Sequence, residues 1–204
     1  MSNHYYSKTP DVQHDRKTLE FELRGVRLRF TTDAGVFSKS GIDFGSRVLI
    51  DALDIPVDAE VLDVGCGYGP IGLSAAKLAT KGHVTMIDIN ERAIALAQEN
   101  AKLNGIDNIT VKQSDVYQSV RENRYDAILT NPPIRAGKSV VHQIFEEGYD
   151  LLKPGGSMWV VIQKKQGAPS AEAKLLERFG NVEEVTKEKG YRIFRAIREN
   201  AVIK

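Results

Sequence analysis

The sequence predicts an α/β domain with a doubly wound, mostly parallel sheet. From residue 57 onward, short apolar runs typical of buried strands alternate with amphipathic segments of helical length. A glycine-rich turn follows the first of these strands, and acidic or amide side chains follow three others. Because the carboxyl ends of parallel strands meet at one edge of a sheet, where such folds bind ligands, a site is expected at that edge.

Composition narrows the class of protein. The chain has 204 residues, enough for one domain with a small extension, and its 42% hydrophobic and 27% charged residues are typical of soluble globular proteins. No apolar run is long enough to span a bilayer, and the N-terminus lacks a signal-peptide pattern. A single cysteine, Cys66, allows no internal disulfide, which favours a cytoplasmic location. The net charge of +1 excludes bulk electrostatic capture of nucleic acid, so any RNA contact must use local basic patches.

Two segments are expected ahead of the core, within a single domain over residues 18–204. Residues 1–17 are polar and predict a flexible arm, in which His4, Tyr5 and Tyr6 either stack on bases or dock on the chain's own domain. Residues 18–54 predict a β-hairpin, turned at Arg24-Gly25, followed by a short helix over residues 43–53. The solvated side of the hairpin carries three arginines that form a candidate RNA-facing edge, Arg24, Arg27 and Arg29.

Residues 55–204 are expected to form the core. Strands are predicted at residues 61–64, 83–89, 109–113, 125–130, 158–163, 182–186 and 191–197, and helices at residues 70–80, 91–104, 139–152 and 169–179. The last two strands are joined only by residues 187–190, which is too short for a crossover helix. That pair is therefore expected to be antiparallel.

The turn after the first core strand reads Asp63-Val64-Gly65-Cys66-Gly67-Tyr68-Gly69-Pro70. Glycines there let the backbone approach a ligand closely, and the following helix presents free N–H groups. A dinucleotide-binding fingerprint would have glycine where this chain has Pro70, which disfavours a nicotinamide dehydrogenase. An acid beside the turn, Asp63, would repel a pyrophosphate and attract an ammonium group. These features favour S-adenosylmethionine (SAM), whose head group is an amino acid.

Two further acids end the next strands. Asp88 is placed to accept hydrogen bonds from both ribose hydroxyls of a nucleoside, and Asp115 to accept from the adenine amine. Either acid alone is more often a loop or cap residue. Their joint occurrence with Asp63 and Asn131, at the ends of four strands, favours a ligand site.

The segment Asn131-Pro132-Pro133-Ile134 follows a buried strand that its prolines must end. It leaves the Asn131 amide oxygen and the Pro132 carbonyl as acceptors facing a crevice. Two acceptors suit a planar NH2 group, such as the exocyclic amine of a nucleobase. The alternative is a strand-to-loop corner in which Asn131 only closes a turn.

These motifs resemble those of SAM-dependent amino-methyltransferases with a seven-stranded, Rossmann-like fold. The segments at residues 35–38, 43–46, 131–138 and 152–156 are similar to the RsmC-like branch, which methylates guanine N2 in small-subunit ribosomal RNA. The resemblance implies that catalysis rests on residues 131–134, Asn131, Pro132, Pro133 and Ile134. It also implies a cofactor site formed by Asp63, Gly65, Cys66, Gly67, Tyr68, Gly69, Asp88, Ile89, Asp115, Val116 and Asn131.

Two departures from that branch matter. The chain corresponds to the catalytic domain alone, whereas the best-studied members have two tandem domains. Ile134 stands where many relatives have an aromatic that stacks on the target base, so Phe37 or Tyr68 is expected to supply stacking. Basic residues after the catalytic turn are expected to contact RNA phosphates, namely Arg135, Lys138 and Lys164.

Other functions remain open. The same Asn-Pro-Pro chemistry would serve adenine N6 or a protein glutamine, and a non-catalytic SAM- or RNA-binding assembly factor is a rival of another class. Intact Asn131, Asp63, Asp88 and Asp115 argue against a dead enzyme. We expect no metal, a monomer, and ribosomal RNA or the small ribosomal subunit as the partner.

Overall fold

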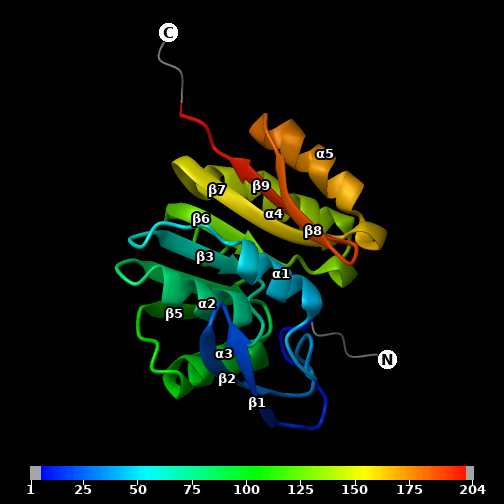
Figure 1. Cartoon of the computed structure of the whole chain (residues 1–204). Coiled ribbons are helices and arrows are strands. Elements are labelled where there is room, and N and C mark those ends of the chain that lie inside the picture. Colours follow the sequence, from blue (N-terminus) through cyan, green and yellow to red (C-terminus); the bar gives the residue numbers. More distant parts are fainter. Residues whose placement is uncertain (1–5, 201–204) are drawn as a thin grey trace.

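A seven-stranded sheet forms the centre of the molecule (Figure 1). The structure is a computed structural model that describes residues 6–200. Its core strands are β3 (Glu60–Val64), β4 (His83–Asp88), β5 (Ile109–Gln113), β6 (Tyr125–Thr130), β7 (Leu152–Gln163), β8 (Glu183–Glu188) and β9 (Tyr191–Ile197). They lie in the order β5-β4-β3-β6-β7-β9-β8.

Strand directions confirm the predicted fold class. The pairs β3·β4, β3·β6, β4·β5 and β6·β7 are parallel, whereas β9 runs antiparallel to both β7 and β8. After β3 the chain builds outward through β4 and β5, and then returns to place β6 on the other side of β3. Connections leave β3 and β6 in opposite directions, which opens a crevice at their carboxyl ends.

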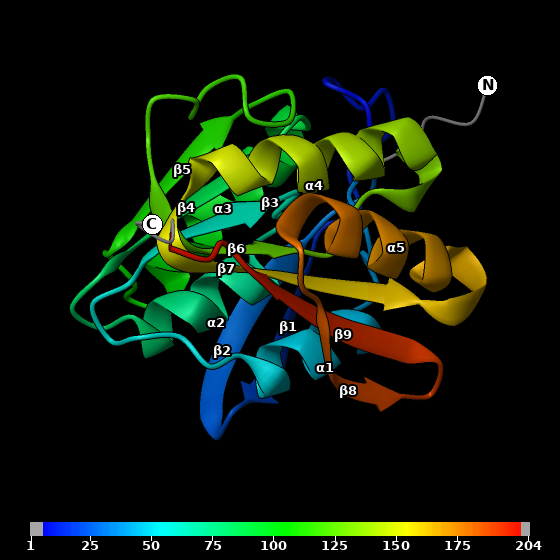
Figure 2. The same cartoon turned by 90° about the horizontal axis from the view of Figure 1, so that it is seen from above.

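Helices cover both faces of the sheet (Figure 2). They are α1 (Phe44–Ala52), α2 (Pro70–Leu78), α3 (Glu91–Leu103), α4 (Lys138–Leu151) and α5 (Ala168–Phe179). One apolar cluster joins α1, α2 and α3 to the sheet, and a second joins α4 and α5 to the opposite face. Alternation along β3 sends Val61 into the first cluster and Leu62 into the second. Within residues 6–200, no helix is both long enough and apolar enough to cross a membrane.

The predicted N-terminal hairpin is formed by β1 (Lys17–Leu23) and β2 (Val26–Thr32). Its second strand packs on α3, where the Asn100 side chain accepts from the Thr31 N–H at 2.7 Å. The Arg24 guanidinium donates to the carbonyl oxygens of Ile50, Asp51 and Leu53 at 2.8–3.1 Å. Those carbonyls belong to the C-terminal end of α1, so Arg24 connects the hairpin to that helix. The sequence had suggested an RNA-facing role for Arg24 instead.

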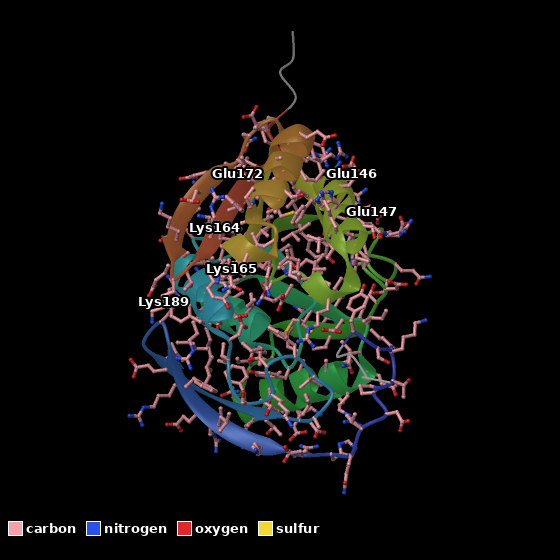
Figure 3. The ribbon with its side chains drawn as sticks, turned by 90° about the vertical axis from the view of Figure 1, so that its right-hand side faces the viewer. Glu146, Glu147, Lys164, Lys165, Glu172 and Lys189 are labelled. Atoms are coloured by element: carbon pink, nitrogen blue, oxygen red, sulfur yellow. The ribbon has the colours of Figure 1, made fainter. Side chains whose placement is uncertain are left out.

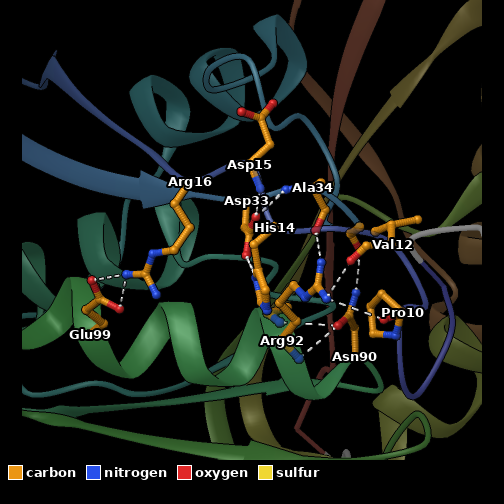
Figure 4. A network of polar contacts seen from close by, with 12 residues as sticks. Pro10, Val12, His14, Asp15, Arg16, Asp33, Ala34, Asn90, Arg92 and Glu99 are labelled. Atoms are coloured by element: carbon orange, nitrogen blue, oxygen red, sulfur yellow. Dashed lines mark hydrogen bonds and ion pairs between the residues drawn. The ribbon is translucent and has the colours of Figure 1, made fainter.

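The arm before the hairpin is fastened to α3 and to the loop after β2 (Figure 4). The Glu91 N–H donates to the carbonyl of Lys8 at 3.0 Å. The Arg92 guanidinium donates to the carbonyls of Val12 at 3.0 Å and Ala34 at 2.6 Å. Residues 6–16 thus dock on the chain's own domain, and the flexibility expected of the arm stays a prediction. His4 and Tyr5 lie outside the described residues.

One element begins earlier than the sequence indicated. A strand was expected at residues 158–163, after a helix ended by the Pro154-Gly155-Gly156 segment, but β7 begins at Leu152 directly after α4. Gly155 takes a φ of +83° and donates its N–H to the carbonyl of Arg198 at 2.6 Å. The glycine segment is therefore an irregularity inside the strand, because its backbone still finds a partner there.

Candidate active site

A cavity of about 760 Å³ opens at the carboxyl ends of β3, β4 and β6. This volume suits a nucleoside-sized ligand. Its walls come from the turn after β3, the ends of β4 and β5, the segment after β6, the loop before α1 and the N-terminal arm. Among the predicted site residues, those that line it are Phe37, Gly65, Gly67, Asp88, Ile89, Val116, Asn131, Pro132, Pro133, Ile134 and Arg135.

The glycine-rich turn brings backbone to the cavity wall. Gly65 and Gly67 have φ angles of +72° and +56°, a region that side-chain-bearing residues rarely adopt. A Cβ atom at either position would meet nothing within 4 Å, so open space lies over both. The N–H groups of Gly65 and Cys66 both donate to the carbonyl of Ile87 at 2.9 Å, which holds the turn against β4. Pro70 follows as the first residue of α2.

Of the three acids expected to bind the cofactor, Asp88 is the one that lines the cavity. Its two carboxylate oxygens accept from the N–H groups of Gly67 at 2.8 Å and Asn90 at 2.9 Å. Burial raises the pKa of Asp88, while hydrogen bonds from the backbone of Asn90, Gly67 and Ile89 lower it in part. Each carboxylate oxygen has a second acceptor site, so the group can still receive ligand hydroxyls.

Asp63 lies behind the turn and does not line the cavity. It shares the face of Val61 and points under the first turn of α2, where a Cβ on Gly72 would lie 2.8 Å from Oδ2. The side chain is fully buried, and neither oxygen accepts a hydrogen bond of ordinary geometry from a described residue. Burial raises the pKa of Asp63 to about 7, with the Gly72 amide lowering it in part and Asp88 raising it.

Asp115 is exposed beside the cavity, between Ser114 and Val116, which line it. The hydroxyl of Tyr6, from the N-terminal arm, lies near the same place. Burial raises the pKa of Tyr6, and the negative charges of Asp115 and Asp88 raise it further. Tyr6 therefore adds an aromatic wall to the end of the cavity where the adenine was expected.

Three predicted cofactor residues of the turn do not reach the cavity. Cys66 and Gly69 lie behind it, and burial raises the pKa of the Cys66 thiol well above its usual range. Tyr68 is 2% exposed, packs edge-on against Phe30 and donates its hydroxyl to the carbonyl of Ser38 at 3.3 Å. Stacking by Tyr68 on a substrate base is therefore wrong, because the ring is enclosed in the core.

The Asn131 amide has a defined orientation. Its Nδ2 donates to Ser46 Oγ at 3.0 Å and to the Asp43 carboxylate at 3.2 and 3.4 Å. Asp43 is also the N-cap of α1, accepting from the Ser46 N–H at 3.1 Å. Since both donors of the amide point toward α1, Oδ1 is left as a free acceptor among the described residues.

The expected substrate residues divide into two groups. Phe37 is 41% exposed and lines the cavity together with Arg135. Lys138 and Lys164 are exposed but outside the lining. Lys164 and Lys165 lie together on the rim after β7, with Lys189 on the neighbouring β8–β9 turn (Figure 3).

Sequence reasoning missed Asp43 and Ser46 as site residues. The resemblance at residues 43–46 was a signal, and so was their spacing, because an aspartate three residues before a serine is typical of a helix start. Gly45 lies between them, and a larger residue would clash there, because a Cβ at this position would lie 2.6 Å from the Tyr191 ring. Residues 6–200 contain no group of three or more His, Cys, Asp and Glu side chains placed to hold a metal ion.

The sheet order, the glycine turn beside Asp88 and the oriented Asn131 at the switch point define a class I methyltransferase of the RsmC-like type. The chain belongs to the methyltransferase small domain family, whose model matches residues 27–195. This membership confirms the predicted class. The site also fits SAM, the predicted methyl donor: bare glycine backbone and the partly satisfied Asp88 carboxylate line the space that it would fill, and the buried, unpartnered Asp63 carboxyl lies behind the turn.

Similar sequences differ in how much of their own length this chain matches. A Bacillus subtilis protein described as uncharacterized, YbxB, is 54% identical and covers 96% of this chain and 98% of its own length. The Vibrio cholerae ribosomal RNA small subunit methyltransferase C is 32% identical over 91% of this chain, and the Pectobacterium atrosepticum large subunit methyltransferase G is 28% identical over 93%. The chain spans only 54% and 51% of these two enzymes.

Among solved structures, the Thermus thermophilus 16S rRNA N2 methyltransferase RsmC, in complex with AdoMet (SAM) and guanosine, is similar to this chain. The TM-score is 0.81 at 25% identity, covering 93% of this chain and 52% of that one. A Pyrococcus furiosus methyltransferase at 19% identity and a TM-score of 0.66 shows the same fold.

Proposed function

We propose that this chain transfers a methyl group from SAM to the exocyclic amine of a base in ribosomal RNA, with guanine N2 of the small-subunit RNA as the target. The observation that carries this proposal is the Asn131 amide. Its NH2 group is turned toward Asp43 and Ser46, which leaves Oδ1 to accept from a ligand at the cavity. An acceptor fixed at this place suits an N–H donor.

Cavity residues would hold the methyl donor as the sequence suggested. The Gly65–Gly67 backbone would lie against it, Asp88 would receive the ribose hydroxyls, and Ile89 and Val116 would enclose the adenine. The Asp115 carboxylate would accept from the adenine amine at the cavity mouth. SAM supplies an electrophilic methyl group on a sulfonium centre. Asp63 would act from behind the turn, where its negative charge favours a cationic ligand.

An exocyclic base amine is a weak nucleophile, because its lone pair is delocalised into the ring. If Asn131 Oδ1 and the Pro132 carbonyl accept its two N–H bonds, the nitrogen becomes pyramidal and its lone pair points at the methyl group. Asn is not a strong base, so the rate gain comes from positioning and fixed acceptors, and the extra proton leaves to solvent after transfer.

The target base would have to leave its RNA stack to reach the cavity. Phe37, which lines the cavity, would stack on it, and Arg135, Lys138 and Lys164 would contact phosphates as it enters. The proposed partner is therefore ribosomal RNA or the small subunit, met in the cytoplasm by a monomer. Support comes from the small-subunit enzymes among the relatives and from the guanosine bound in the Thermus structure.

Large-subunit ribosomal RNA is the second candidate. The Pectobacterium enzyme named for that subunit is similar over almost the same share of this chain as the small-subunit enzymes. The residues around Asn131 suit either RNA, because they would contact only the base and its nearest phosphates.

Transfer of labelled methyl from SAM tests the proposal. Small subunits, large subunits, free ribosomal RNA, tRNA and total protein are offered in parallel, with Asn131→Ala as the inactive variant. We expect label in small-subunit RNA and a loss of at least a hundredfold in the variant. Label in protein or in large-subunit RNA would show that this acceptor, and not small-subunit RNA, is the substrate. SAM binding without transfer to any acceptor would favour the assembly factor.

A further inference from the structure

Asp43 and Ser46 hold the Asn131 amide from a segment that lies 85 to 88 residues earlier in the chain. We infer that these two are positioning residues for the reaction: they fix which end of the Asn131 amide faces the substrate. This inference rests on the proposed amine methylation and adds residues that the Asn-Pro-Pro segment does not contain.

The argument begins with the amide itself. Its oxygen and NH2 group are nearly the same size, so packing alone does not select one of the two orientations related by a 180° turn. In the wrong orientation the amide would present donors to an incoming amine, which is also a donor. Catalysis through Asn131 therefore needs an outside group that distinguishes the two ends.

The Asp43 carboxylate is such a group, because a carboxylate only accepts hydrogen bonds. Both of its oxygens lie within 3.4 Å of Asn131 Nδ2, and a flipped amide would set an oxygen against them instead. Ser46 alone would not select one amide orientation, since a hydroxyl can either donate or accept a hydrogen bond. It is committed, however, by donating to Asp43 Oδ1 at 2.6 Å, which leaves its oxygen to accept from Asn131.

Both residues are themselves held in place. Ser46 is 5% exposed, and Asp43 caps α1 through the Ser46 N–H. Tyr191 packs where a Cβ on Gly45 would lie, and α1 is fixed at its other end by Arg24. Asp43 and Ser46, together called the clamp, are therefore held by the fold itself and do not depend on a bound ligand.

Asp43→Asn separates positioning from capping. Asn and Asp are about equally good N-cap residues, so a pure capping role predicts no effect. An amide at position 43 offers both a donor and an acceptor, so Asn131 is free to flip. We expect a loss in kcat of ten- to a hundredfold with an unchanged KM for SAM and an unchanged Tm. Ser46→Ala should lose less, and Asp51→Asn, an exposed acid on the same helix, should lose nothing.

Hydrogen exchange of the Asn131 side-chain NH2 gives a readout that needs no substrate. Its NMR signals are identified by their loss in Asn131→Ala. We expect slow exchange in the wild type and at least tenfold faster exchange in Asp43→Asn. If either kcat or exchange in Asp43→Asn equals that of the wild type, the clamp is wrong. If the wild type methylates no RNA but shows the exchange difference, the proposed substrate fails and the clamp stands.

Discussion

At the scale of single residues, the site depends on which way short side chains point. Asp63 and Val64 are neighbours in β3, yet only Val64 lines the cavity, because successive strand residues face opposite sides of the sheet. Side chains two residues apart in a strand face the same side of the sheet, and Asp63 comes two residues after Val61. The place of Asp63 under α2 could therefore have been predicted from the sequence. The direct contact with the cofactor that the resemblance implied for Asp63 remains a prediction.

Asp63 should make stability depend on pH. Its pKa rises from 3.8 to about 7 on folding, so the folded chain holds this proton more tightly, and the resulting stability is lost as pH rises from about 4 to about 7. Asp63→Asn removes the ionisable group at nearly constant volume. We expect the Tm of the cofactor-free variant to exceed that of the wild type at pH 8, with a difference that shrinks toward pH 5. A difference that does not vary with pH would contradict the shift.

Gly67 should matter for the cofactor more than for folding. Gly67→Ala places a Cβ at a φ of +56°, and Gly25→Ala in the hairpin does the same at +75°, each in open space. Both changes cost about 1–2 kcal/mol in backbone strain, so their Tm values should fall by similar amounts. Only Gly67→Ala should weaken SAM binding, by tenfold or more in calorimetry. Equal affinities in the two variants would remove the turn from the cofactor site.

At the scale of elements, α1 links the hairpin to the Asn131 segment that follows β6. Its first turn holds Asn131 through Asp43 and Ser46, and its last carbonyls accept from Arg24. The apolar spacing predicted a short helix at residues 43–53, where α1 lies, because that pattern is local. The spacing did not predict these two contacts, since hydrogen bonds between distant segments leave no local pattern.

Arg24→Ala should therefore destabilise the fold. Removing one guanidinium takes a donor from the carbonyls of Ile50, Asp51 and Leu53, of which Ile50 keeps the Leu53 N–H at 3.4 Å. The loss should cost about 1–3 kcal/mol and several degrees of Tm. Arg27→Ala is the matched control in the same hairpin, because within residues 6–200 the Arg27 side chain makes only a surface ion pair with Glu20 at 3.8 Å. Equal Tm values for the two variants would show that the α1 end does not need Arg24.

At the scale of the whole molecule, strand order creates the site. The chain reverses its direction of growth between β3 and β6, and the glycine turn and Asn131 follow those two strands. Strand-helix alternation predicted this edge, so Asp88 and Asn131 were placed correctly from the sequence. Tyr6 was expected either to stack on bases or to dock on the chain's own domain. Its place in the cavity wall was not predicted, because it depends on how Arg92 and Glu91 hold the arm.

The central claim is that the cavity methylates an exocyclic amine through Asn131. The most direct test is to digest RNA methylated by the wild type to nucleosides and to identify the modified atom by chromatography and mass spectrometry. The account predicts N2-methylguanosine, absent from the Asn131→Ala reaction. A methyl group on a ring carbon or a ribose oxygen would contradict it, because neither presents the pair of N–H donors that we propose Asn131 Oδ1 and the Pro132 carbonyl accept.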